Sequence, residues 1–313
     1  MINKILIIGY GSIGRKYYKI IKSNYKNIKI YVYTRQNISN IRTIKSFSEI
    51  MLCKPDITIF CNPSSKRLKI FEVIKKTGSH ILFEKPLANN FKRNNINEHK
   101  NKIYRVGYNL RQLNILKKFK SLISDNKIGK IYCYNIEAGE YLPNWRKKEY
   151  FKTVSAKRAL GGGVILELSH EIDYAIWIFG KILKIRALFG KFSNLNIDTE
   201  DIAKILFLNK KNIIGSINLD FLSYEKKRFC HVIGSKGELF LNFIKKNIQY
   251  YDNNNKKWKI IYRSDQNINE TYLMQVNEMM KLINNKKFKD SLGTIVSSKY
   301  VLKIIDKIKN TKK

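Results

Sequence analysis

The chain has 313 residues, which exceeds one ordinary domain and indicates two. Hydrophobic residues make up 44% and aromatic residues 12% of the sequence, a composition that indicates a globular protein and excludes a disordered one. Lysine and arginine number 61 against 24 aspartates and glutamates, so the formal net charge is +37.

A positive charge of this size normally suggests a nucleic-acid-binding protein. Here the lysines are spread along the whole sequence, no nucleic-acid module is recognisable, and asparagine and isoleucine are abundant throughout. This pattern is typical of a genome biased towards A and T codons, so we expect no specific nucleic-acid partner. The positive field would still speed the encounter with anionic ligands such as nucleotide sugars.

Neither targeting segments nor covalent cross-links are indicated by the sequence. It has no run of about 18 apolar residues, and its first residues read as a core strand rather than a signal peptide, so we expect a cytoplasmic protein without membrane contact. The cysteines and the histidines, four of each, are scattered, which predicts neither a disulfide framework nor a metal site.

The first element is a hydrophobic strand at 3–9 that runs into a glycine-rich turn and an amphipathic helix. Gly9 would make the tight turn, Gly11 would let the backbone approach a pyrophosphate, and Gly14 would let helix and strand pack closely. The helix N-terminus would face the phosphates. The alternative is a purely structural glycine turn. The residues expected at the phosphates are Gly9, Gly11, Ser12, Ile13 and Gly14.

The second strand, 28–34, decides between the two dinucleotides. An acidic residue at its end would grip the ribose 2′-hydroxyl of NAD, but this sequence has Thr34 followed by Arg35. A hydroxyl beside a guanidinium suits a 2′-phosphate, because arginine pairs with phosphate by charge-assisted hydrogen bonds. We therefore expect NADP(H) to be preferred over NAD(H). The alternative is that Arg35 is one more surface cation.

Residues 1–110 alternate between strands and helices, two of which are marked by 46–52 and 66–77. This alternation predicts a Rossmann domain, a doubly wound parallel sheet. Its strands are expected at 3–9, 28–34, 56–61, 79–83 and 103–107.

Residues 111–313 are β-rich and predict an α+β domain with an antiparallel or mixed sheet. Helices are expected at 111–126, 165–179, 268–284 and 290–309, with the last helix able to pack back on the first domain. Strands are expected at 130–140, 182–192, 200–208, 212–222, 228–234 and 237–243.

A family resemblance rests on motifs that follow one another in order: GYGSIG, CNPS at 61–64, FEKPLA, GYNLR at 107–111 and GGGVILELSHEIDYAIWIFG at 161–180. Together they resemble the Gfo/Idh/MocA family of oxidoreductases, which includes glucose–fructose oxidoreductase and inositol dehydrogenase. The resemblance implies a Rossmann domain joined to a domain with a large, mostly antiparallel sheet. It also implies hydride transfer between a nicotinamide and a sugar or related compound, and a homodimer or homotetramer.

Lys85 is the expected acid/base, because taking a hydride from an alcohol requires a group that accepts the hydroxyl proton. It follows the fourth long strand, at the carboxyl edge where doubly wound sheets bind ligands, and Pro86 would restrict its backbone. The alternative is a surface lysine before a turn proline. Besides Thr34 and Arg35, the resemblance places Asn62, Pro63, Glu84 and Lys85 at the cofactor.

The helix after Gly161–Gly163 carries the remaining candidate catalytic residues. The resemblance matches His170 to the active-site histidine and Asp173 to the aspartate that follows it. The family usually has an aspartate four residues before the histidine, whereas this sequence has Leu166 there and Glu167 at three, which puts the role of that acid in doubt. The alternative for His170 is a hydrogen-bonded histidine at a domain seam.

Aromatic and cationic residues near the glycines suggest contacts to a sugar, since flat rings pack on sugar faces and arginines bind phosphate or carboxylate. Asn109 and Arg111 lie where the chain passes between the domains and are expected to face the cleft. The alternative is loop packing or solvated charge. The expected substrate-binding residues are Asn109, Arg111, Tyr141, Trp145, Arg146 and Arg158.

These features predict an NAD(P)-dependent oxidoreductase that acts on the hydroxyl or carbonyl carbon of a sugar or nucleotide sugar. The ELSHEIDY and YLPNWR segments resemble family members of surface-polysaccharide sugar biosynthesis. The rival hypothesis is a non-catalytic dinucleotide-binding sensor or assembly protein.

Overall fold

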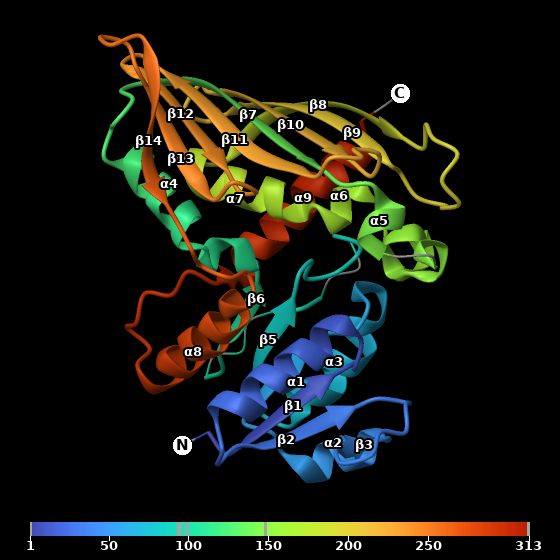
Figure 1. The fold of residues 1–313 in the computed structure, drawn as a ribbon. Helices are drawn as coiled ribbons and strands as arrows, with labels where there is room; N and C mark the ends of the chain where they lie inside the picture. The colour runs from blue at the N-terminus through green and yellow to red at the C-terminus, as the bar shows by residue number, and fades with distance from the viewer. Residues whose placement is uncertain (1, 93–94, 98, 100, 147–148, 312–313) are drawn as a thin grey trace. The chain divides into compact units, whose positions relative to one another are not determined.

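The structure is a computed structural model that describes residues 2–92, 95–97, 99, 101–146 and 149–311 (Figure 1). The chain forms two compact units, each described below by itself. The first unit consists of Met1–Gln112 with Asn267–Leu302, and the second of Leu113–Gln266 with Lys303–Lys313.

The first unit is built on a seven-stranded sheet in the order β15-β6-β5-β4-β1-β2-β3. All neighbours in it are parallel except β15, which pairs antiparallel with β6. Apolar runs such as ITIF in β4 are buried throughout, as a sheet covered on both faces requires. The strands are β1 (Lys4–Ile8), β2 (Lys29–Tyr33), β3 (Arg42–Ile44), β4 (Ile57–Phe60), β5 (His80–Glu84), β6 (Tyr104–Gly107) and β15 (Gly293–Thr294).

Helices cover both faces of this sheet. On one face, Tyr17 and Ile21 of α1 and Val276 and Met279 of α8 share a buried core with β1, β2, β4 and β5. Phe71 of α3 instead contacts Phe83, with ring centroids 5.9 Å apart. The helices are α1 (Ser12–Asn24), α2 (Phe47–Cys53), α3 (Arg67–Lys76) and α8 (Glu270–Asn284).

The second unit is built on an eight-stranded sheet in the order β14-β13-β12-β11-β7-β10-β9-β8. Only the pairing of β7 with β10 is parallel, so the mostly antiparallel sheet is confirmed. The strands are β7 (Ile131–Gly139), β8 (Ile182–Gly190), β9 (Ile202–Asn209), β10 (Ile214–Asp220), β11 (Lys227–Gly234), β12 (Gly237–Asn242), β13 (Asn247–Asp252) and β14 (Lys257–Arg263).

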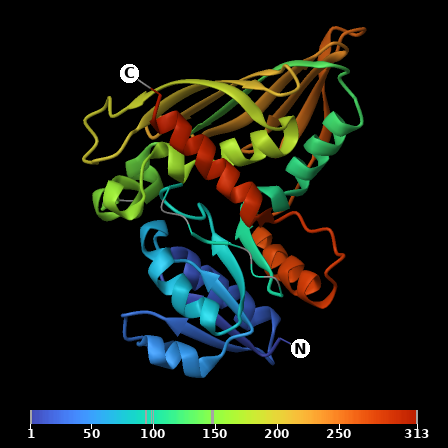
Figure 2. The same cartoon turned by 180° about the vertical axis from the view of Figure 1, so that it is seen from behind.

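The helices of the second unit lie on one face of its sheet (Figures 1 and 2). They are α4 (Asn114–Ser124), α5 (Leu142–Arg146), α6 (Val164–Glu167) and α7 (Ser169–Phe179), followed at the end of the chain by the last turns of α9 (Ile295–Lys309). No helix or strand of the described residues covers the opposite face, which we call the open face. Along β7 the residues facing the helices, such as Ile136 and Ala138, are buried, whereas Asn135 on the open face is partly exposed.

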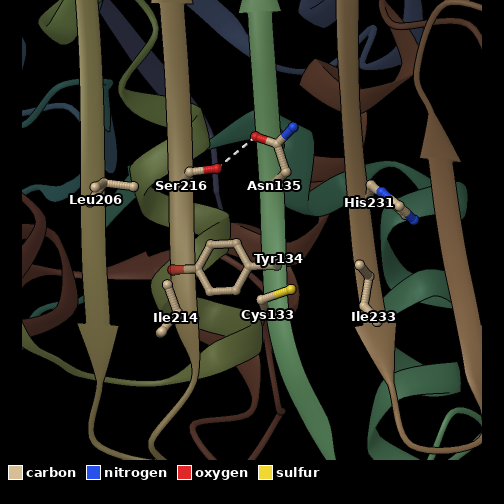
Figure 3. Close-up of a pocket in the computed structure, with 8 residues that line it drawn as sticks. All are labelled: Cys133, Tyr134, Asn135, Leu206, Ile214, Ser216, His231 and Ile233. Atoms are coloured by element: carbon tan, nitrogen blue, oxygen red, sulfur yellow. Dashed lines mark hydrogen bonds between the residues drawn. The ribbon is translucent and has the colours of Figure 1, made fainter.

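A pocket of about 230 Å³ lies on the open face. Figure 3 shows its side chains standing on neighbouring strands, with Ser216 of β10 donating a 2.7 Å hydrogen bond to Asn135 of β7. None of the residues that the sequence nominated for catalysis lines this pocket. Its lining is Cys133, Tyr134, Asn135, Leu206, Ile214, Ser216, His231 and Ile233.

The structure corrects several element boundaries. Three strands of two to seven residues (β3, β14 and β15), the strand β13 and the short helix α5 were not predicted from the sequence. The single helix expected at 165–179 is interrupted at Leu168 and forms α6 and α7, and α9 begins at Ile295 rather than at 290.

All four cysteines are free thiols. Within the described ranges, no group of histidine, cysteine and acidic side chains is arranged to hold a metal ion. None of the described helices combines the length and the apolar character needed to cross a membrane.

Candidate functional site

The glycine loop between β1 and α1 has three positions with different steric needs. Gly9 has a φ of +93°, a conformation that favours glycine. A Cβ on Gly14 would lie 2.1 Å from the carbonyl oxygen of Gly9, so only glycine allows the helix to pack this closely. A Cβ on Gly11 would meet nothing within 4 Å. The surface beside Gly11 is therefore open to a ligand.

The residues around this loop fit a dinucleotide. Gly11 is the N-cap of α1 and supplies no side-chain cap, so the first amides of the helix, from Ser12 and Ile13 onward, lack that partner. Asn62, just after β4, lies against Gly9, because a Cβ added to Gly9 would lie 3.1 Å from the Asn62 backbone. The Asn62 side chain is 9% exposed, and neither of its amide atoms has a hydrogen-bond partner among the described residues. A buried polar group of this kind is rare in native proteins, and a ligand or an ordered water beside Gly9 would satisfy it.

Thr34 and Arg35 follow β2 at the carboxyl edge of the same sheet. The Thr34 hydroxyl accepts a 3.2 Å hydrogen bond from the amide of Gln36, and Arg35 is exposed. Lys45, directly after β3, donates to the carbonyl of Gln36 at 2.5 Å. Two cations, Arg35 and Lys45, thus lie beside the carboxyl end of β2. Lys45 was not predicted as a site residue because the short strand β3 was not recognised in the sequence.

Glu84 ends β5 at this edge, and Lys85 follows it directly. Glu84 is 8% exposed and accepts a 2.8 Å hydrogen bond from the Tyr17 hydroxyl. Burial raises the pKa of the Glu84 carboxyl, while the Tyr17 hydrogen bond and the charges of Arg67 and Lys85 act in the opposite direction. Lys85 is half-buried, and its peptide bond to Pro86 is cis.

Two further residues of the first unit, Asn109 and Arg111, lie in a short 3-10 helix (Asn109–Gln112) after β6. Both are buried, at 7% and 6% exposure. The amide nitrogen of Asn109 donates to the hydroxyl of Thr271 at 3.1 Å, and the Arg111 guanidinium lies 5.8 Å from the centre of the Tyr108 ring. Their role in substrate binding stays a prediction.

The second unit holds the other predicted catalytic residues on α6 and α7. His170 is 8% and Asp173 1% exposed, so both are buried. Glu167, at the end of α6, forms a 2.9 Å ion pair with Arg146, whose Nε also donates to Ser155 at 3.0 Å. The structure therefore joins two residues to which the sequence assigned separate roles, proton transfer and substrate binding.

The glycines before α6 are required by packing. A Cβ on Gly162 would lie 2.2 Å from the carbonyl oxygen of Val154, and one on Gly163, whose φ is +105°, would lie 2.4 Å from the Glu200 carboxylate. Protein atoms thus occupy the space beside both glycines, so neither position is open to a ligand.

The remaining predicted substrate contacts lie in the irregular segment between β7 and α6. The Tyr141 ring lies 4.6 Å from that of Tyr224, and the Trp145 ring lies 4.2 Å from the Arg146 guanidinium. Arg158 is exposed, and its backbone amide donates to Asp198 at 2.6 Å. All of these side chains belong to the second unit.

A protein-family model matches part of the second unit. Residues 116–240 match the family model described as the GFO/IDH/MocA C-terminal domain. The resemblance to the Gfo/Idh/MocA family is confirmed. No curated protein sequence matches the chain.

Solved structures share the fold described above along almost the whole chain. Levoglucosan dehydrogenase in complex with NADH matches with a TM-score of 0.84 at 15% identity, over 98% of this chain and 95% of that one. An oxidoreductase from Thermotoga maritima gives 0.81 at 17%, over 99% and 96%. An oxidoreductase from Agrobacterium radiobacter in complex with NAD⁺, L-tartaric acid and magnesium gives 0.79 at 15%, over 100% and 98%. At sequence identities this low, the structural similarity establishes the fold alone.

Proposed function

We propose that the protein is an NAD(P)-dependent oxidoreductase that moves a hydride between the cofactor and a hydroxyl or carbonyl carbon of a sugar. The observation that carries this proposal is the unpartnered amide of Asn62 beside the open glycine loop, at the same sheet edge as Lys85. The fold supports it, because structures with the same fold have been solved with NADH and with NAD⁺. The nicotinamide, when bound, supplies the hydride acceptor or donor.

The first unit would hold the cofactor. The backbone at Gly11, Ser12 and Ile13 would bind the pyrophosphate, because helix N-termini attract anions. Asn62 would donate or accept hydrogen bonds through its buried amide, with Pro63 shaping the turn after it. Glu84 would lie next to the nicotinamide end, together with Lys85.

We propose NADP(H) as the preferred cofactor and NAD(H) as a weaker one. Support comes from Arg35, which is exposed, and from Lys45 next to the same loop. Both can pair with a 2′-phosphate, and no acidic side chain follows β2 directly. The structures solved with NADH and NAD⁺ support a dinucleotide site in general. The preference for NADP(H) over NAD(H) is argued from Thr34 and its cationic neighbours alone.

For the chemistry, Lys85 would accept the hydroxyl proton during oxidation and return it during reduction. His170 would bind the reacting oxygen or relay that proton, with Asp173 orienting it. The Arg146 ion pair occupies Glu167, so we assign this acid to shaping the segment before α6 rather than to proton transfer.

The substrate would be a sugar or nucleotide sugar, as in surface-polysaccharide biosynthesis. Support comes from the aromatic side chains of Tyr141 and Trp145 and from the positive net charge, which attracts anionic ligands. Asn109, Arg111 and Arg158 remain proposed contacts.

Self-association would use the open face of the second unit. Leu188, Leu206 and Ile214 stand on that face at 73%, 56% and 59% exposure. Exposed apolar surface of this kind marks an interaction site. A second copy of the chain is the proposed partner, which gives a homodimer or homotetramer.

The decisive experiment is a titration with NADPH and with NADH that follows nicotinamide fluorescence, combined with turnover of a panel of sugars. We expect tight NADPH binding, weaker NADH binding and turnover that a Lys85→Met protein loses while it still binds cofactor. If neither dinucleotide binds, the proposal is wrong. If the wild type binds cofactor but turns over no sugar, the non-catalytic sensor or assembly protein is favoured instead.

A further inference from the structure

Arg67 is a buried cation that the chemistry above does not use. It is the first residue of α3, on the segment that follows β4, and it is 3% exposed. Burial lowers the pKa of its guanidinium to about 10, so it keeps its charge at neutral pH. A buried charge is costly unless hydrogen bonds compensate it. Its partners therefore reveal what it does.

Among the described residues, the Arg67 guanidinium donates its hydrogen bonds to backbone carbonyls of two neighbouring segments. Nε and Nη2 donate to the carbonyl of Asn62 at 3.2 and 3.1 Å. Nη1 donates to the carbonyls of Glu84 and Pro86 by short hydrogen bonds. The planar guanidinium, with donors on three nitrogens, can hold both segments in one fixed geometry.

These two segments carry the residues on which the proposed site depends. The carbonyl of Asn62 belongs to the residue whose unpartnered amide lies beside the glycine loop. The carbonyls of Glu84 and Pro86 belong to the residues on either side of Lys85. One side chain thus fixes the backbone on both sides of Lys85 and ties it to the backbone of Asn62.

We infer that Arg67 is a positioning residue, which sets the Lys85 backbone relative to Asn62 and so aligns the acid/base with the cofactor. This inference rests on the proposed function. Its rival is a purely structural role, in which the guanidinium only stabilises the first unit.

The test compares Arg67→Lys and Arg67→Met with Arg105→Met. Lysine keeps the charge but has a single nitrogen, which cannot reach both segments in the fork geometry. Arg105 is the matched control: it lies in the same unit, is 16% exposed, and forms a 3.2 Å ion pair with Asp290. Its loss should destabilise the unit without touching the segments around Lys85.

Two quantities are measured well below the melting temperature of each protein. One is the dissociation constant of NADPH. The other is the rate at which acetic anhydride acetylates Lys85, followed by mass spectrometry of the Lys85 peptide with and without saturating NADPH. In the wild type and in Arg105→Met, NADPH should slow acetylation. In both Arg67 variants we expect this protection to be lost and the dissociation constant to rise about three- to tenfold.

The outcomes separate the two proposals. Wild-type protection and affinity in a folded Arg67→Lys or Arg67→Met protein, with only a lower melting temperature, would show that Arg67 is merely structural. Equal losses in Arg105→Met would show the same. If NADPH fails to protect Lys85 in the wild type, the proposed function itself is at fault, and the positioning role falls with it.

Discussion

The hydroxyl of Tyr17 donates a 2.8 Å hydrogen bond to the carboxylate of Glu84, and both side chains are buried. The side chain of Gln275, from α8, lies 2.5 Å from the same hydroxyl. The Gln275 atom at this distance is Oε1, an acceptor, so the one phenol proton of Tyr17 is shared between the Glu84 carboxyl and the Gln275 side-chain oxygen. The helix after the glycine loop, the strand before Lys85 and α8 are thereby linked by one polar network.

A Tyr17→Phe substitution would remove the hydroxyl donor from buried Glu84 with little change of shape. We expect the free energy of unfolding in urea to fall by about 1–3 kcal/mol, the range for a buried polar group that loses its partner. Tyr18→Phe is the matched control, because Tyr18 is half-buried on the same helix and its hydroxyl makes no hydrogen bond within the described part of the chain. Equal losses in the two variants would contradict this role for Tyr17.

Two alanine substitutions in the glycine loop should separate binding from folding. Gly11→Ala places a methyl group in open space, so the melting temperature should stay unchanged while NADPH affinity falls, because the pyrophosphate can no longer approach. Gly14→Ala drives a methyl group into the Gly9 carbonyl, so the melting temperature itself should drop. Thermal unfolding and fluorescence titration of both proteins check this. Undiminished NADPH affinity in Gly11→Ala would argue against a phosphate at this loop.

Arg35→Ala should weaken NADPH binding about 10- to 100-fold, the effect of losing a charge-assisted hydrogen bond, and should leave NADH binding unchanged. Arg42→Ala serves as the control, since Arg42 is an exposed cation on the neighbouring strand β3. Titrations with both dinucleotides measure the ratio of the two affinities. A ratio that stays at the wild-type value in Arg35→Ala would mean that this side chain does not bind a 2′-phosphate.

His80 should make stability fall in weakly acidic solution. Burial, followed by the charge of Lys102, lowers the pKa of His80 to about 4, and its Nδ1 accepts a 3.0 Å hydrogen bond from the amide of Ile103. The unfolded chain takes up this proton near pH 6.5, so the contribution to stability is lost as the pH falls from about 6.5 to about 4.

We expect the loss to be about 1 kcal/mol, because solvent at the half-exposed ring screens much of the shift. Urea unfolding of the wild type and of His80→Asn at several pH values checks this, with the difference between the two curves isolating the histidine. A difference that is constant from pH 7 to 4 would rule the effect out.

A charge on the open face should dissociate the proposed oligomer. Leu206→Glu would place a carboxylate among apolar side chains of the interface, so light scattering should show a smaller particle than the wild type at the same micromolar concentration. Leu52→Glu is the control, because Leu52 is 81% exposed on α2 of the first unit. A wild type that is monomeric across this range would overturn the proposal.

The sequence predicted the buried strands better than the exposed ones. The five long strands of the first sheet were recognised because short apolar runs such as ITIF are typical of buried strands. The edge strand β14 was missed because its lysines, Lys257 and Lys259, read as part of a polar loop, although charged side chains are what protects an edge strand from pairing with other chains. The strand β3 has only three residues and no apolar run.

The candidate site was predictable where a motif fixes the backbone and unpredictable where contacts join distant segments. The steric needs of Gly9 and Gly14 follow from the strand–turn–helix pattern. Neither the Arg146–Glu167 ion pair nor the contacts of Arg67 with the carbonyls of Glu84 and Pro86 have a local signature, because each joins residues 17 to 21 positions apart in the sequence. Arg67 also resembled many other cations in a chain of this composition.

The placement of α8 has a consequence for protein synthesis. Its side chains Tyr272, Val276 and Met279 complete the core over the strands of the first unit, all but one of which are made within the first 112 residues. A nascent chain of that length therefore carries a parallel sheet with part of one apolar face uncovered, and it must wait for some 170 further residues. Until then the growing chain is a natural client for holding chaperones, and an isolated fragment of residues 1–112 should aggregate.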